Sequence, residues 1–174
     1  MTETTKAGGL RLAREDVTLS EADAFVYYAR HDLVLGSGFG SAISTRGGPG
    51  IQEELEEKAP VETGDVVVSE AGELPARHIL HAVGPRFQEP DVEGKLRETM
   101  RNALAAADGL GIGSLAFPPM GAGYYGVPLD VCARVMVEEI RSHLAGKTSL
   151  RDVVICVQDR REEEAFEAPL RGGM

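Results

Sequence analysis

The sequence lacks basic tracts, long apolar runs and cysteine clusters, and each absence excludes a class of protein. It holds 18 lysines and arginines against 28 acidic residues, for a formal net charge of −10. The basic surface that duplex DNA or RNA binding requires is therefore missing. No stretch approaches the roughly 18 apolar residues that span a bilayer, and residues 1–5 do not resemble a signal peptide. We expect a cytoplasmic protein with no membrane and no DNA partner.

The two cysteines, Cys132 and Cys156, lie far apart, each in an apolar run. Neither belongs to a CxxC motif or to a Cys/His pattern with the spacing of metal ligands. We expect buried free thiols in a reducing compartment, and we predict no metal site and no cofactor.

Apolar runs of strand length alternate along the chain with amphipathic segments of helix length. The runs at 24–29, 65–69, 77–83, 114–117 and 153–157 predict strands, and 10–14 predicts an edge strand. Helices are expected at 52–57, 93–108 and 129–144, with an acidic helix from about 162. This alternation predicts one α/β domain over 10–170, with a mixed central sheet between two helical layers. Residues 1–9 are expected to form a disordered tail.

Two glycine-rich segments each follow an expected strand. They read Gly-Ser-Gly-Phe-Gly at 36–40 and Gly-Ala-Gly-Tyr-Tyr-Gly at 121–126. Glycine lets backbone N–H groups approach phosphate oxygens and tolerates positive φ. Neither segment is a Walker A motif or a dinucleotide-binding fingerprint. The pair predicts a phosphate clamp made of backbone amides, which needs no lysine or arginine.

Five motifs in a fixed order connect the chain with a known family. They are Glu-Asp-Val-Thr at 15–18, Asp-Ala-Phe-Val at 23–26, Gly-Ser-Gly-Phe at 36–39, His-Ala-Val-Gly-Pro at 81–85, and a segment from Phe-Pro at 117 to Gly126. In this order they resemble the macro domain family, over nearly the whole chain. The resemblance implies a three-layer α/β/α macro domain that binds ADP-ribose, free or attached to protein.

The resemblance also implies roles for individual residues. Asp16 would accept a hydrogen bond from the adenine amino group, although a turn-capping role is the alternative. Amides of the first loop would face the distal phosphate and ribose, and amides of 121–124 would hold the other phosphate. Tyr125 would pack on the distal ribose, whereas His81 is expected to be structural. The predicted ligand-binding residues are Asp16, Val17, Gly36, Gly38, Phe39, Gly40, Pro118, Gly121, Ala122, Gly123, Tyr124, Tyr125 and Gln158.

The chain departs from the hydrolytic members of the family at the end of the 24–29 strand. Those members use Asn-Ala-Ala-Asn there, but this sequence has Tyr27 and Arg30 in place of the two asparagines. The second loop carries no acid at 121–123. Gln-Glu-Glu at 52–54 lies too far after Gly38 to match the glycohydrolase branch, and we expect it to be a solvated helix face. Gln158 stands where the family stacks an aromatic ring on adenine.

Arg30, His31 and Asp32 are the remaining candidates for catalysis, with an exposed polar loop as the alternative. The preferred hypothesis is a module that binds ADP-ribose or an ADP-ribosylated protein. The alternative is an ADP-ribosyl hydrolase, or an enzyme that processes ADP-ribose derivatives, with a non-standard first loop. A binder of single-stranded RNA or poly(A) is disfavoured by the negative charge.

Overall fold

A computed structural model describes residues 2–7, 9–123 and 125–172. The strands are β1 (Thr2–Ala7), β2 (Leu10–Arg14), β3 (Ala24–Tyr28), β4 (Val66–Glu70), β5 (His78–Ala82), β6 (Ser114–Phe117) and β7 (Asp152–Val157). The helices are the 3-10 turn η1 (Val17–Leu19), α1 (Phe39–Gly47), α2 (Gly50–Glu56), α3 (Val92–Leu110), α4 (Leu129–Ala145) and α5 (Arg160–Gly172). No helix in these ranges is long and apolar enough to cross a membrane.

The strands form one mixed sheet in the order β1-β2-β7-β6-β3-β5-β4. The five inner strands run parallel, and β1 and β4 pair antiparallel with β2 and β5 at the two edges. The expectation of a disordered tail at 1–9 was wrong, because residues 2–7 form the edge strand β1. The 10–14 strand is consequently an inner strand. Pairing at an edge uses backbone hydrogen bonds, so polar residues without an apolar pattern can provide it.

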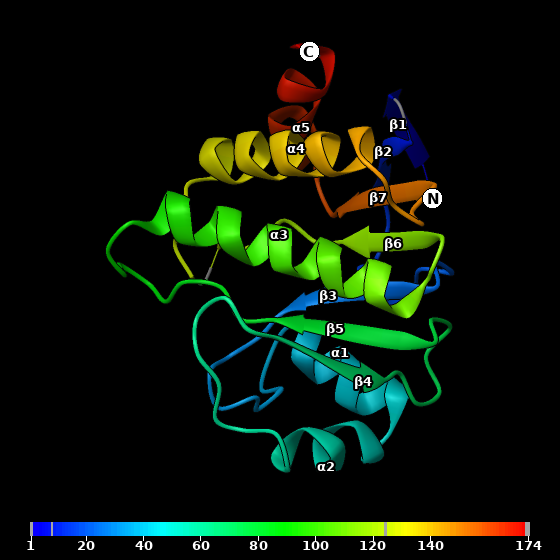
Figure 1. The fold of residues 1–174 in the computed structure, drawn as a ribbon, viewed down its shortest axis with the longest axis vertical. Helices are drawn as coiled ribbons and strands as arrows, with labels where there is room; N and C mark the ends of the chain where they lie inside the picture. Colours follow the sequence, from blue (N-terminus) through cyan, green and yellow to red (C-terminus); the bar gives the residue numbers. More distant parts are fainter. Residues whose placement is uncertain (1, 8, 124, 173–174) are drawn as a thin grey trace.

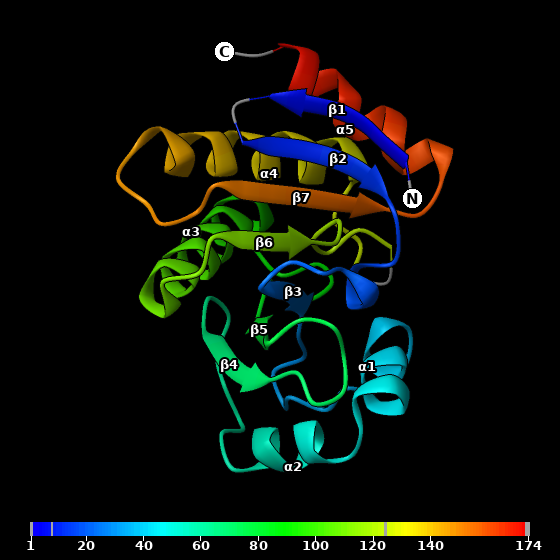
Figure 2. The same ribbon diagram turned by 90° about the vertical axis from the view of Figure 1, so that its right-hand side faces the viewer.

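Helices cover both faces of the sheet, which confirms the three-layer α/β/α architecture (Figures 1 and 2). Successive strand residues point to opposite faces. In β3, Ala24, Val26 and Tyr28 pack on the layer of α3, α4 and α5. Phe25 packs on the other layer, with Ile43 of α1 and Leu55 of α2. The sheet therefore lies between two separate hydrophobic cores.

The parallel pairing of β3 with β6 fixes the location of the candidate site. Ala24 lies opposite Leu115 and Phe25 opposite Ala116, so the two strands are neighbours with their carboxyl ends at the same edge. The first glycine-rich loop follows β3 and the second follows β6. Ligands of parallel α/β sheets bind at this edge.

Candidate functional site

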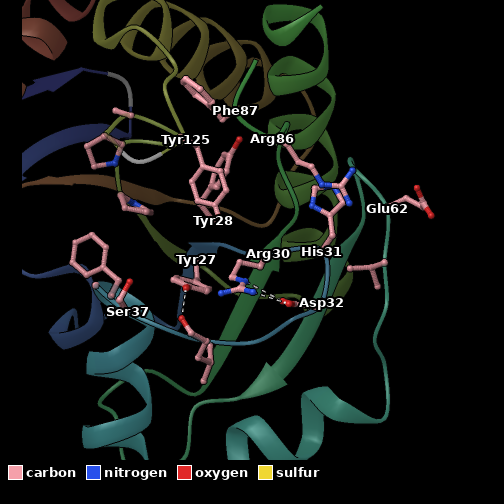
Figure 3. Close-up of a pocket in the computed structure, with 18 of the residues that line it drawn as sticks. Tyr27, Tyr28, Arg30, His31, Asp32, Ser37, Glu62, Arg86, Phe87 and Tyr125 are labelled. Atoms are coloured by element: carbon pink, nitrogen blue, oxygen red, sulfur yellow. Dashed lines mark hydrogen bonds and ion pairs between the residues drawn. The ribbon is translucent and has the colours of Figure 1, made fainter. Parts of the chain in front are cut away.

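A cavity of about 1210 Å³ opens at the carboxyl ends of β3 and β6. Its walls come from both glycine-rich loops, from the segment at 60–62, and from Arg86 and Phe87 after β5. Ser37 lies toward one end of the cavity, and His31, Glu62 and Arg86 lie toward the other (Figure 3). Tyr28 and Tyr125 lie between them with ring centroids 4.6 Å apart.

Tyr27 ties the end of β3 to the first glycine-rich loop. Its hydroxyl donates a hydrogen bond of 2.9 Å to the Leu35 carbonyl, and burial raises the pKa of Tyr27 to about 12. The Gln52 side chain of α2 holds the same loop from outside, because it accepts from Leu35 N and donates to Leu33 O. Gln52 is half-buried, so the prediction of a solvated helix face was wrong for this residue.

Tyr28 ties β3 to the opposite wall. Its ring lies against Gly84 and Gly121, where a Cβ atom would come within 2.3 Å and 3.1 Å of it. Its hydroxyl donates to the Pro85 carbonyl, and burial raises the pKa of Tyr28. Two adjacent tyrosines thus contact the two loops on opposite sides of the cavity.

Arg30 and Asp32 form a two-pronged ion pair at the cavity wall (Figure 3). Arg30 Nε and Nη2 donate to the two Asp32 oxygens at 3.1 and 2.8 Å. Asp32 also accepts from Val34 N. The hydrogen bond from Val34 and the pair with Arg30 outweigh burial and lower the pKa of Asp32. Asp32 is therefore ionised at neutral pH and pairs with the Arg30 guanidinium at the cavity wall.

His31 belongs to a hydrogen-bonded chain that reaches Glu89. Its Nε2 lies 2.8 Å from the Thr63 hydroxyl, which is 3.3 Å from Glu89 Oε1. Glu89 also pairs with Lys95 and accepts from Arg86 N, and these contacts lower its pKa. Burial and the nearby Arg86 guanidinium lower the pKa of His31, so the imidazole is neutral at neutral pH.

Asp16 lies outside the cavity lining and is already bonded on both oxygens. Oδ1 accepts hydrogen bonds from the backbone N–H and the hydroxyl of Thr18. Asp16 is thus the N-cap of η1. Oδ2 pairs with Arg46 of α1 at 3.0 Å. Burial opposes ionisation, but the contacts with Thr18 and Arg46 outweigh it and lower the pKa of Asp16. The capping role is thus present in the structure.

The structure brings most of the sequence-predicted site residues together around the cavity. The lining includes Arg30, His31, Asp32, Gly38, Phe39, Pro118, Gly121, Ala122, Tyr125 and Gln158. It does not include Asp16, Val17, Gly36, Gly40 or Gly123 among the described residues. Tyr124 lies outside the described residues.

Sequence reasoning missed one wall of the cavity. It is formed by Pro60, Val61, Glu62, Arg86 and Phe87. Phe87 is 62% exposed at the cavity, and its ring packs where a side chain at Gly126 would otherwise stand. The available signal was an aromatic residue in a polar loop directly after Gly-Pro.

The sequence is similar to that of macro domain proteins. The macro domain profile matches residues 28–136. A macro domain-containing protein of Streptomyces coelicolor is 37% identical over 93% of this chain and 98% of its own. An uncharacterized protein of Pyrobaculum aerophilum is 40% identical over 90% of this chain and 86% of its own.

The fold also matches solved structures of macrodomains. A mutant of the Oceanobacillus iheyensis macrodomain with ADPR superposes with a TM-score of 0.88 at 25% identity, covering 98% of this chain and 97% of that one. The Trypanosoma brucei macrodomain in complex with ADP-ribose gives 0.86 at 28% identity, covering 92% and 68%. The layered α/β/α fold of this chain is the fold of these solved macrodomains. This chain belongs to the macro domain family.

Proposed function

We propose that this protein binds ADP-ribose, free or attached to a protein, in the cavity between the two glycine-rich loops. The observation that carries the proposal is the meeting of these loops at the carboxyl ends of β3 and β6. Glycines with positive φ occur in both loops, at Gly36 and Gly38 and at Gly121, Gly123 and Gly126. Such backbone directs N–H groups toward a bound anion.

Backbone donors suit the charge of the chain. The net charge is −10, and acidic Asp32, Glu62 and Glu162 line the cavity beside Arg30 and Arg86. An anion held mainly by amides needs no positive surface. Two structures that resemble this chain were solved with ADPR or ADP-ribose, which supports the choice of ligand.

The cavity is large enough for ADP-ribose. Small-molecule sites usually occupy about 300–1,000 Å³, and the volume here is about 1210 Å³. We propose that adenine lies toward Gln158 and the distal ribose toward Tyr125 and Arg30.

Cys132 and Cys156 are buried and free, which fits action in a reducing cytoplasm.

Calorimetric titration tests the binding proposal. ADP-ribose should bind more tightly than ADP or AMP, because only ADP-ribose places a ribose beside Tyr125 and Arg30. The proposal fails if ADP-ribose gives no binding heat with the folded protein, or if AMP binds as tightly as ADP-ribose.

Hydrolysis of ADP-ribose derivatives is a second candidate function. The observation that favours it is the neutral His31 at the cavity wall, in a hydrogen-bonded chain with Thr63 and Glu89.

A further inference from the structure

The hydrogen bonds of Thr63 fix which nitrogen of His31 carries the proton. A carboxylate only accepts, so the Thr63 hydroxyl donates its single proton to Glu89. The same hydroxyl oxygen must then accept from His31, and Nε2 is the donor. Neutral His31 is therefore protonated on Nε2, and its Nδ1 carries a lone pair.

His31 lines the cavity. The one hydrogen bond that its imidazole makes within the described residues is the bond through Nε2, so none of these residues occupies the lone pair on Nδ1. Glu89 is held in turn by Lys95 and by Arg86 N. The imidazole is thus oriented through two successive partners, which is how a base is positioned for proton transfer.

Charged groups of both signs surround the ring. The Arg86 guanidinium disfavours the protonated imidazolium, and three carboxylates favour it. These four groups are Arg86, Glu89, Glu62 and Asp32. A neutral imidazole accepts a proton, and this suits activation of water for attack on a carbonyl carbon. Cleavage of a glycosidic bond would instead need a group that gives a proton to the leaving oxygen.

We propose that His31 is a general base, positioned by Thr63 and Glu89, for hydrolysis of carboxylic esters on the distal ribose of ADP-ribose. The proposal rests on ADP-ribose binding with the distal ribose toward Tyr125 and Arg30, next to His31. Nδ1 takes a proton from water as the water oxygen bonds to the ester carbonyl carbon. The ester C–O bond then breaks, and His31 returns the proton to the departing ribose oxygen. The products are ADP-ribose and a carboxylic acid.

The test combines turnover and binding on the same samples. The substrate is ADP-ribose acetylated on its distal ribose, and His31→Gln should lower kcat by about 100-fold or more. This variant should still bind ADP-ribose measurably by calorimetry, which separates loss of turnover from loss of the pocket. His78→Asn, on β5 outside the cavity lining, is the matched control and should retain wild-type turnover.

Thr63 is a positioning residue, and its variants separate orientation from structure. Thr63→Val removes the hydroxyl with little change of shape and should lower kcat by about tenfold. Thr63→Ser retains the hydroxyl and should restore the rate. In the wild type, kcat/KM should rise with pH through an inflection below the ordinary histidine pKa of about 6.5, because only unprotonated His31 accepts the proton. His31→Gln should abolish this inflection.

The outcomes separate the two proposals. Wild-type turnover that His31→Gln or Thr63→Val leaves unchanged overturns the role of His31. Tight ADP-ribose binding without hydrolysis of the ester also overturns it, but leaves the binding proposal intact. Absence of ADP-ribose binding refutes the binding proposal itself.

Discussion

The second glycine-rich loop can be tested at Gly123, where charge and backbone strain can be separated. Gly123 has a φ of +86°, and a Cβ atom there would meet nothing within 4 Å. Any side chain therefore has room, but it carries a conformational cost of about 1–2 kcal/mol. Gly123→Ala and Gly123→Glu share that cost, and only the second adds a negative charge.

The expected loss of affinity is calculated for a phosphate held by this loop about 5 Å from the new carboxylate, although Gly123 itself does not line the cavity. At that separation and an effective dielectric constant of about 20, the two charges repel each other by about 3 kcal/mol. This amounts to about two decades in Kd. Gly123→Glu should therefore bind ADP-ribose about 100-fold more weakly than Gly123→Ala, which should retain most of the wild-type affinity.

Calorimetry measures the two affinities, and circular dichroism with thermal melting checks that both variants are equally folded. Equal Kd values for folded Gly123→Ala and Gly123→Glu would contradict a phosphate at this loop. A large loss in Gly123→Ala alone would instead assign the effect to backbone geometry.

Three further predictions concern adenine, the first loop and pH. Asp16→Ala should weaken binding of adenosine-based ligands by about 1–3 kcal/mol. It should also remove their advantage over inosine-based ligands in competition assays. If the wild type binds both bases equally, Asp16 has only its capping role. Gly40→Ala would place a Cβ atom 1.6 Å from the Leu35 carbonyl oxygen, so urea denaturation should reveal a loss of about 1–3 kcal/mol. The control is Gly50→Ala in α2, where the added Cβ atom meets nothing within 4 Å and φ is not positive, and its loss should be much smaller. Burial lowers the pKa of His81 from 6.5 to about 3, so only the unfolded chain gains this proton as pH falls from 6.5 toward 3, and stability falls with it by up to about 1.4 kcal/mol per pH unit. His81→Leu should lose less stability between pH 6.5 and 4.5 than the wild type, and equal losses would contradict this assignment.

The inner strands and the long helices were predictable from the sequence because their apolar patterns are strong. The helix expected at 93–108 spans Val92–Leu110, and the strand expected at 153–157 spans Asp152–Val157. Strand β1 was not predictable in this way. The polar sequence at 2–7 has no apolar face, and only the backbone pairing with β2 makes it a strand.

The candidate site was predictable where motifs lie within one loop, and it was missed where tertiary structure joins distant segments. Residues 36–40 and 121–126 were found through their glycines. The chain from His31 through Thr63 to Glu89 spans 58 positions of sequence, and no local pattern connects its members. The structural role of Tyr27 was hidden as well, because the acceptor of its hydroxyl is a backbone carbonyl.

The adjacent positions of Tyr27 and Tyr28 have a consequence for the mechanics of ligand entry. One dipeptide at the end of β3 contacts the first loop through the Leu35 carbonyl and the second through Gly121. The two loops are therefore anchored to neighbouring residues of one strand. A substitution at either tyrosine should shift one loop relative to the other and change which ligands enter the cavity.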